Sequence, residues 1–293
     1  FYRLLSLLLG SYEKNLLAKY LRVVTWCPRC ETALAEAEIE YEDRADPSIY
    51  VKFPLLEQSG SRGGEYLLIW TTTPWTLVGN LAVMVHPDFE YVRAKTPEGI
   101  LILAKELAHV LRDKLGLEYE VIETIKGSQL EGLKYKNPLS DVINVMPRSK
   151  NAYTVILSSE FVTLGEGTGC VHCAPGHGPE DFEVGARYGI EPLCPVDERG
   201  TFTKEAGKYH DLSVKKHDEV IINDLKEKKV LQLSETITHR YGHCWRCKTP
   251  IIYRATEQWF IKVSEIKDEM LRQTERVEWV PEWAGSARFR DWV

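Results

Sequence analysis

The sequence of 293 residues has no long apolar run and no excess of positive charge. No apolar stretch approaches the ~20 residues that cross a bilayer, so we expect no membrane-spanning segment. Lysine and arginine number 37 against 43 aspartates and glutamates, and the net charge of −6 argues against a protein that coats nucleic acid broadly. Local contact with an RNA end stays compatible, because it needs only a pocket with a few cationic side chains.

A secretory signal is also lacking, because no convincing cleavage site follows the apolar run at residues 4–9. Leucines and tyrosines recur there at helical spacing as far as Tyr20, which predicts an amphipathic helix. The seven cysteines are therefore expected in a reducing compartment, where paired cysteines more often bind metal or do redox work than form structural disulfides. We expect a cytoplasmic protein.

Two Cys-x-x-Cys pairs lie near the two ends of the chain, at Cys27/Cys30 and Cys244/Cys247. Their spacing matches that of a four-thiolate zinc site. The pairs can complete one tetrahedron only if the intervening segment leaves and returns at adjacent points, as an inserted domain does. We expect one structural zinc shared by both pairs, and two independent redox pairs are the alternative, since spacing alone does not separate them.

Two further stretches predict a pocket for a polar ligand. Residues 70–76 read Trp-Thr-Thr-Thr-Pro-Trp-Thr after an apolar, strand-like run, so several hydroxyls arrive where a strand ends. Residues 167–182 are rich in glycine and proline and supply His172 and Asp181. The simpler interpretations are that threonine favours strands and caps, that Asp181 is an ordinary acid at a helix N-terminus, and that a lone histidine is a hydrogen-bonded core residue.

The same two stretches closely resemble the editing domain inserted into isoleucyl-tRNA synthetases, which hydrolyses valine wrongly attached to the isoleucine tRNA. Valyl and leucyl relatives usually carry Thr-Thr-Arg-Pro at the first motif, so Thr73 and Trp75 favour the isoleucyl branch. The resemblance extends from Trp26 to Phe260. It implies an editing hydrolase that deacylates valyl-tRNA(Ile), with valyl-adenylate as a further candidate substrate, and it implies the tRNA 3′ end and the remainder of the synthetase as partners.

The resemblance also implies the roles of the residues in the pocket. Asp181 would hold the α-ammonium of the amino acid through a charge-assisted bond. His172 would lie at the end of the amino-acid side chain and exclude isoleucine by its bulk, and the hydroxyls would contact the adenosine, the ribose and a water. The candidate catalytic residues are Thr71, Thr72, Thr73, Thr76 and Asp181, and the candidate substrate-binding residues are Trp70, Asn80, His172 and Asp181.

Cys170 and Cys173 form a third pair that straddles His172, which alone would suggest a zinc hydrolase or deaminase. In the resembling family these two positions vary, so we expect small buried apolar residues instead. The His-x-Gly-His and Lys-Met-Ser-Lys-Ser motifs of the ATP-dependent synthetic site are missing from the sequence. We expect a piece of a larger enzyme, without ligase activity of its own and without a metal in the hydrolytic site.

The many short strand-like runs and few helices predict a mixed α/β, β-rich fold, with a β-barrel-like editing domain on a zinc-bearing stem. We expect a stem at residues 1–45, the editing domain at 46–212, and a return helix with the second cysteine pair at 213–293. Helices are expected at residues 181–188 and 214–229. The alternative function is a zinc-stemmed module that binds tRNA or protein without catalysis.

Overall fold

The computed structural model describes residues 2–57 and 64–293. Contacts between residues divide the chain into two units, one formed by the two ends (Phe1–Arg22 and Thr256–Val293) and one by Val23–Ala255. The second unit holds both motifs and all the cysteine pairs. Among the described helices, none combines the length and the apolar character needed to cross a membrane.

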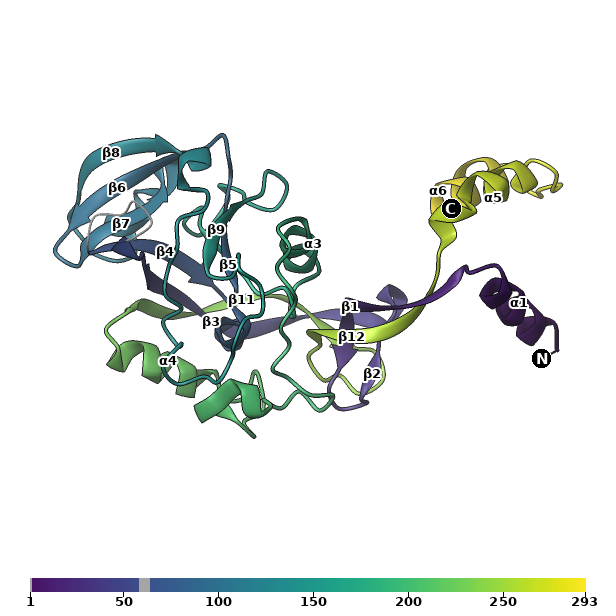
Figure 1. Ribbon diagram of the computed structural model, residues 1–293, viewed down its shortest axis with the longest axis horizontal. Coiled ribbons are helices and arrows are strands. Elements are labelled where there is room, and N and C mark those ends of the chain that lie inside the picture. Colours follow the sequence, from purple (N-terminus) through teal and green to yellow (C-terminus); the bar gives the residue numbers. More distant parts are fainter. Residues whose placement is uncertain (1, 58–63) are drawn as a thin grey trace. The chain divides into compact units, whose positions relative to one another are not determined.

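Strands dominate the described part of the chain, and the helices are short (Figure 1). The strands are β1 (Leu17–Cys27), β2 (Thr32–Ala33), β3 (Ile39–Pro54), β4 (Glu65–Thr71), β5 (Ala82–Val85), β6 (Glu90–Thr96), β7 (Gly99–Ala104), β8 (Glu120–Lys126), β9 (Thr154–Leu157), β10 (Val171–Cys173), β11 (Leu231–Cys244) and β12 (Ile252–Ile261). The α-helices are α1 (Tyr2–Glu13), α2 (Val110–Asp113), α3 (Pro179–Arg187), α4 (Asp218–Glu227), α5 (Lys267–Thr274) and α6 (Arg290–Trp292). Short 3₁₀ turns are η1 (Glu36–Glu38), η3 (Pro74–Gly79), η4 (Lys105–Leu107), η5 (Gly127–Leu130), η6 (Lys204–Tyr209) and η7 (Val263–Glu265), and a π-helical turn, η8, covers Ala284–Phe289.

The described strands form three open sheets. A six-stranded sheet has the order β11-β3-β4-β7-β6-β8, a second sheet has the order β10-β5-β9, and a third has the order β12-β1-β2. The mixed, β-rich class predicted from the sequence is confirmed. The described strands do not close into a barrel, because the six-stranded order ends at β11 and β8 rather than returning on itself.

The long pairing of β3 with β11 positions both the site and the cysteine pairs. The two strands run antiparallel from Leu231↔Val51 to Cys244↔Ile39. On its other edge β3 pairs with β4, which ends at the threonine motif. The return segment of the chain is thereby tied to the same sheet as the first motif.

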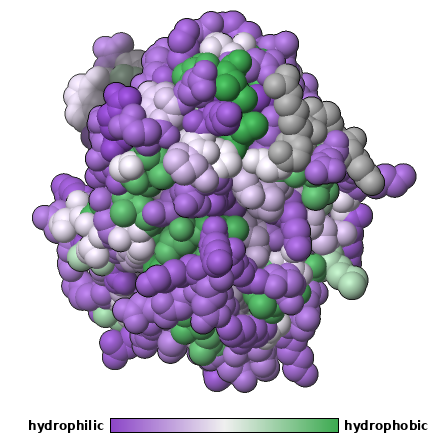
Figure 2. Space-filling model, turned by 90° about the vertical axis from the view of Figure 1, so that its left-hand side faces the viewer, coloured by the Kyte–Doolittle hydropathy of each residue, from purple (hydrophilic) through white to green (hydrophobic). Residues whose placement is uncertain are grey.

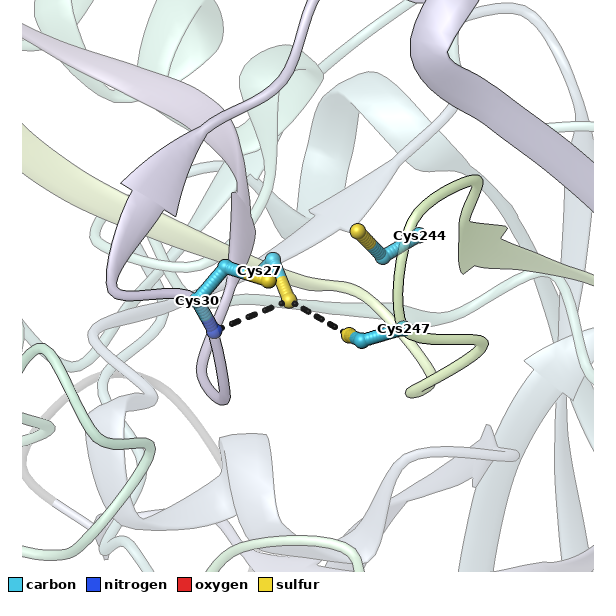
Figure 3. Close-up of side chains that lie close together, drawn as sticks. All are labelled: Cys27, Cys30, Cys244 and Cys247. Carbon is cyan, nitrogen blue, oxygen red and sulfur yellow. Dashed lines mark hydrogen bonds between the residues drawn. The ribbon is translucent and has the colours of Figure 1, made fainter.

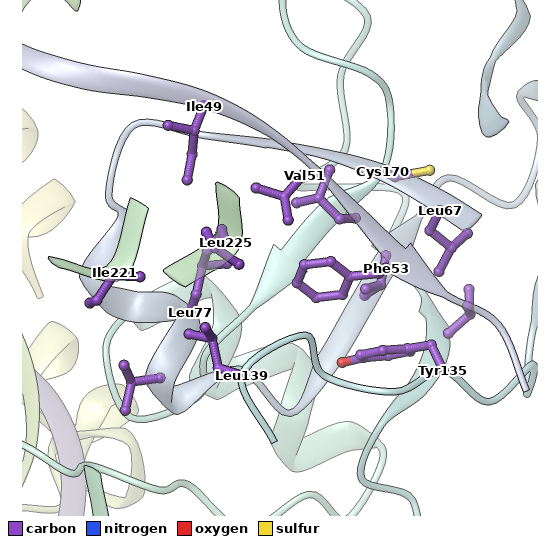
Figure 4. Packing of buried hydrophobic residues seen from close by; sticks show 14 of the residues in the cluster. Ile49, Val51, Phe53, Leu67, Leu77, Tyr135, Leu139, Cys170, Ile221 and Leu225 are labelled. Carbon is purple, nitrogen blue, oxygen red and sulfur yellow. The ribbon is translucent and has the colours of Figure 1, made fainter. Parts of the chain in front are cut away.

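A buried apolar cluster joins the inner face of this sheet to η3 and α4. Ile221 and Leu225 of α4, Leu77 of η3 and Ile49 of β3 all belong to this cluster, and Figure 4 draws them. A smaller cluster packs α3 through Val184 against the β10-β5-β9 sheet. The face seen in Figure 2 is mostly hydrophilic, with hydrophobic residues in small separate patches.

The helix predicted at the start of the chain is shorter than expected. It ends at Glu13, and Leu16 and Tyr20 lie beyond it; β1 begins at Leu17. Asn15 has a φ of 58°, a left-handed conformation that asparagine tolerates and that ends a helix. The extension of the helical pattern to Tyr20 was therefore wrong, because the later apolar positions pair in a sheet.

Candidate functional site

The threonine motif follows β4 and enters a tight 3₁₀ turn. Trp70 and Thr71 are the last two residues of β4, and Pro74 opens η3 because its fixed φ suits the first helical position. The Trp70 indole Nε1 donates to Ser48 Oγ at 2.8 Å, which fixes the ring against β3. Gly167 has a φ of +80°, and a Cβ there would lie 2.8 Å from Cε3 of Trp70. The second motif thus packs its backbone directly on the indole.

Three threonine hydroxyls are joined in a row, which we call the threonine array (Thr71, Thr73 and Thr76). Thr73 Oγ1 lies 3.2 Å from Thr71 Oγ1 and 3.2 Å from Thr76 Oγ1. The Thr76 hydroxyl donates to the Thr73 carbonyl at 2.7 Å and lies 3.0 Å from Nε2 of His172. Because the single proton of Thr76 is used on the carbonyl, His172 must donate Nε2–H to Thr76 Oγ1.

His172 is a neutral imidazole. It lies on β10, opposite Val83 of β5, and is 8% exposed. Burial, with a further contribution from His177, lowers the pKa of His172 to about 4. The ring therefore presents an uncharged edge, with Nε2–H committed to the threonine array and Nδ1 free of hydrogen-bond partners among the described residues.

Asp181 lies in the first turn of α3, and one of its oxygens closes the preceding loop. The Ala174 N–H donates to Asp181 Oδ2 at 2.9 Å. A Cβ at Gly178 would lie 2.7 Å from the same oxygen, so a side chain there would displace the carboxylate. Burial raises the pKa of Asp181 to about 7, against the opposing effect of the Ala174 hydrogen bond.

These groups surround one cavity of about 500 Å³. Its lining joins β4 and the threonine motif to the loop before β10, to β10 itself and to α3. The lining residues are Trp70, Thr71, Thr72, Thr73, Phe161, Thr163, Gly165, Glu166, Gly167, Thr168, Gly169, Cys170, Val171, His172 and Asp181. A second cavity of about 640 Å³ adjoins it and shares Trp70, Thr72, Gly165, Glu166 and Gly167.

Two of the residues singled out in the sequence lie beside the cavity rather than on its lining. Thr76 contributes through its hydrogen bonds to Thr73 and His172. Asn80 is fully buried; its amide donates to the Ala82 carbonyl, and its oxygen accepts from the Tyr135 hydroxyl at 2.7 Å. Asn80 thus ties the end of η3 to β5, and its contacts support a positioning role.

Cys170 and Cys173 are buried thiols whose pKa values burial raises. The Cys173 thiol donates to the Asp181 carbonyl at 3.6 Å. Neighbours in a strand point to opposite faces, so Cys173 cannot join His172 around one ion. In the described ranges, the groups of three or more possible metal ligands do not include this pair.

The two outer cysteine pairs do meet. The sulfur atoms of Cys27, Cys30, Cys244 and Cys247 all lie within 4.8 Å of one another. Figure 3 shows the pairs facing each other from two separate hairpin-like loops, one after β1 and one after β11. Cys27 Sγ lies 3.4 Å from Cys247 Sγ. A tetrahedral zinc with bonds of about 2.3 Å places its sulfurs about 3.8 Å apart, so the four residues fit such an ion.

The two cysteine pairs share a backbone feature, a left-handed residue directly after the second cysteine. Glu31 and Lys248 each follow the second cysteine of a pair, and their φ values are 51° and 58°. The prediction that the intervening segment leaves and returns at adjacent points is confirmed, because β1 and β11 both end there.

Comparisons with known proteins agree with these features. A family profile described as tRNA synthetases class I (I, L, M and V) matches residues 5–293. The isoleucine–tRNA ligase of Methanothermobacter thermautotrophicus is 56% identical over 283 residues, which are 97% of this chain and 26% of that protein. That of Archaeoglobus fulgidus is 54% identical over 288 residues, covering 97% of this chain and 28% of the relative. The chain thus spans about a quarter of the length of the curated relatives it matches.

A solved structure shares the fold. "The crystal structure of GlLeuRS-CP1" superposes with a TM-score of 0.51 at 17% sequence identity, over 64% of this chain and 99% of that one. The resemblance to isoleucyl enzymes inferred from the two motifs is confirmed by relatives that cover almost the whole chain. The chain therefore belongs to the class I tRNA synthetases, in the group of the isoleucine, leucine, methionine and valine enzymes.

Proposed function

We propose that the chain is an editing hydrolase that removes valine from valyl-tRNA(Ile). The observation that carries this proposal is that one cavity collects the threonine motif, His172 and Asp181 from three separate segments. The relatives are named isoleucine–tRNA ligases, and a solved structure with the same fold is described as GlLeuRS-CP1. An ester at the terminal ribose of a tRNA is an activated bond, so positioning and electrostatic stabilisation can supply much of the catalysis.

The amino-acid end of the substrate has a natural anchor in Asp181. A carboxylate in a partly enclosed cavity binds an ammonium group strongly, because the charge-assisted bond replaces water on both partners. Only one of its oxygens has a hydrogen-bond partner among the described residues, the Ala174 N–H. The other oxygen can accept the α-ammonium of the substrate.

The hydroxyl groups of Thr71, Thr72 and Thr73 would hold the ribose and the attacking water. The water oxygen bonds to the acyl carbon, and the bond from that carbon to the ribose oxygen breaks. One water proton ends on the ribose oxygen, which becomes a hydroxyl, and the amino acid leaves with the water oxygen in its new carboxyl group, which releases the second proton to solvent. The adjoining cavity, which shares Trp70 and Thr72, gives room for the nucleotides that precede the ester.

His172 would act as the steric limit for the amino-acid side chain. Its ring is buried, uncharged and fixed by the hydrogen bond to Thr76, so its edge cannot move aside easily. A synthetic site discriminates poorly between side chains that differ by one methylene, and a second, smaller site can remove the smaller product. A cavity that admits valine and excludes isoleucine would serve that purpose.

For the four cysteines we propose a structural zinc ion. Four soft thiolates in a closed tetrahedral set suit Zn²⁺, and such sites stabilise a fold without leaving an open coordination position. The residues that would hold it are Cys27, the last residue of β1, and Cys30 in the loop after it, with Cys244, the last residue of β11, and Cys247 in the loop after it. The ion would join the two chain segments at the base of the β3–β11 ribbon.

The test is deacylation of valyl-tRNA(Ile) and isoleucyl-tRNA(Ile) by the purified chain. We expect selective loss of valine that Asp181→Ala strongly slows and that Glu180→Ala leaves intact, because Glu180 is an exposed acid in the same turn and does not line the cavity. Hydrolysis of both esters alike, or near-normal turnover in Asp181→Ala, would contradict the proposal. Binding of tRNA without turnover would favour a zinc-stemmed binding module.

A further inference from the structure

A carboxylate from the return segment of the chain contacts the threonine motif. Asp218 is the first residue of α4 and is 9% exposed. Its Oδ1 accepts the backbone N–H of Trp75 at 3.1 Å, although the two residues are 143 positions apart. No sequence motif links them, and the roles assigned above do not use Asp218.

The hydrogen bond occupies the place of a helix cap. The first N–H groups of a helix have no acceptor within it, and the side chain before the helix usually caps the second or third of them. In η3, Pro74 has no N–H, and Trp75 offers the first free donor. Asp218 satisfies this donor from outside the turn.

Thr73 therefore does not need to act as the N-cap of η3, although it stands at the N-cap position. It precedes η3 and has a capping side chain, yet its hydroxyl makes no cap. Its carbonyl accepts the Thr76 N–H at 3.1 Å, and its hydroxyl contacts those of Thr71 and Thr76. The Thr73 side chain lines the cavity. The hydroxyl can do this because the Trp75 N–H already has an acceptor.

The surroundings hold Asp218 in this position. Ile221 and Leu225, on the same helix, pack in the cluster that contains Leu77 of η3 (Figure 4). Burial raises the pKa of Asp218 to about 6, and Lys215 opposes this rise. The other charged groups that act on it are Asp46 and Arg44 of β3. The carboxylate has neighbours of both signs, and its hydrogen bond to the Trp75 N–H ties it to the threonine motif.

We propose that Asp218 is a positioning residue of the editing pocket, which caps η3 from α4 and so leaves the Thr73 hydroxyl directed into the cavity. This inference rests on the proposed function. It predicts that loss of the carboxylate lets the Thr73 hydroxyl compete for the Trp75 N–H. The Thr73 hydroxyl would then leave the threonine array, although no residue that lines the cavity has been changed.

Activity of single variants gives the first test. In deacylation of valyl-tRNA(Ile), Asp218→Ala should lower kcat roughly 2- to 30-fold, the range that corresponds to a lost cap. Asp218→Asn retains an acceptor oxygen and should restore most of the rate. Asp224→Asn is the matched control, because Asp224 is a buried acid of the same helix that bonds Lys208 and Tyr209 instead. Equal loss in Asp218→Asn and Asp218→Ala would overturn the capping role.

A double-mutant cycle separates positioning from general destabilisation. Thr73→Val removes the hydroxyl and nearly preserves the shape, so Asp218→Ala should have little further effect on kcat in that background. Additive losses would show that Asp218 does not act through Thr73, and would overturn the proposal.

Hydrogen exchange at the Trp75 amide tests the contact without reference to activity. In a Thr73→Val background, where no hydroxyl can replace the carboxylate, the amide should be protected when residue 218 is aspartate or Asp218→Asn, and should exchange faster in Asp218→Ala while the β3–β4 amides keep their protection. Unchanged protection of Trp75 would overturn the inference. If the wild type shows no turnover at all, the proposed function fails, and this exchange measurement still decides whether Asp218 caps the motif.

Discussion

The ionisation of the Asp181 carboxyl should affect both the free energy of unfolding and the rate of deacylation, so this residue gives the sharpest prediction. Burial raises the pKa of Asp181 from 3.8 to about 7 in the chain with an empty cavity. Between pH 4 and pH 7 the folded chain therefore holds a proton that the unfolded chain has released. Stability must fall as the pH rises through this window. Three pKa units at ~1.36 kcal/mol each set an upper limit of about 4 kcal/mol, and water in the cavity reduces it.

Asp181→Asn stays uncharged at every pH, so it should lack this decline. Relative to the wild type, the variant should gain up to that amount of unfolding free energy at pH 8 and gain none below pH 4. Urea denaturation at a series of pH values measures the difference. The control Glu180→Gln removes an exposed charge that adds to the raised pKa, so it should shift the window slightly to lower pH.

The activity of the same variants should follow the same ionisation in the opposite sense. The α-ammonium needs the charged carboxylate, so kcat/KM for valyl-tRNA should rise about tenfold per pH unit below pH 7. It should fall again as the substrate amine loses its proton, near pH 8 for α-amino groups in peptides. Loss of a charge-assisted bond worth about 1.5–3 kcal/mol predicts a roughly 10- to 150-fold lower kcat/KM in Asp181→Asn at neutral pH. A flat profile between pH 5.5 and 7.5, together with an unchanged stability slope in the variant, would refute the reasoning.

Three further predictions concern the steric limit, the metal and the cavity wall. His172→Ala should allow hydrolysis of isoleucyl-tRNA(Ile), with a roughly 5- to 150-fold increase in its rate, because relief of an overpacked contact is worth about 1–3 kcal/mol; single-turnover deacylation measures it. Cys244→Ser should reduce bound zinc from about one ion per chain to a small fraction, whereas Cys170→Ala should not, as atomic absorption of dialysed protein would show. Gly167→Ala should destabilise the chain by about 1–3 kcal/mol in urea unfolding and slow deacylation, since its Cβ would meet the Trp70 ring and its φ is +80°.

Each of the three has a clear contrary outcome. Continued resistance of isoleucyl-tRNA in His172→Ala would remove the steric role of that ring. Loss of metal in Cys170→Ala, or its retention in Cys244→Ser, would place the ion elsewhere. Wild-type stability in Gly167→Ala would mean that Trp70 moves without cost.

The sequence predicted well those elements whose pattern is local. The apolar run before the threonine motif is β4, the acid-opened helix is α3, and the charged amphipathic segment contains α4. The cysteine spacing predicted a cluster of four thiols, and the four cysteines do lie close together in the structure. In each case neighbouring residues share a periodicity or a ligand spacing, and tertiary contacts agree with it.

Strand β11 was missed, although its sequence carried a signal. Its residues alternate in exposure from Glu235 to Arg240, and Thr236-Ile237-Thr238 is a β-branched run. Charged and hydroxyl side chains interrupt the apolar positions, because one face of this edge strand meets water. The strand owes its length to its pairing with β3, which lies far away in the sequence.

The same limit applies within the site. The motifs identified Thr73, His172 and Asp181, but the sequence did not show that Thr76 lies between Thr73 and His172 or that Asn80 faces inward. Nor could it identify Asp218, since nothing local distinguishes this acid from any other at the start of a helix. A hydroxyl serves a cavity only if the backbone donor beside it is satisfied by another group. In this chain that group comes from the return helix, which is held against η3 by the apolar cluster around Leu77 and Leu225. The proposed editing pocket therefore depends on a segment that contributes nothing to its lining, and Asp218→Ala should alter the pocket before it unfolds the chain.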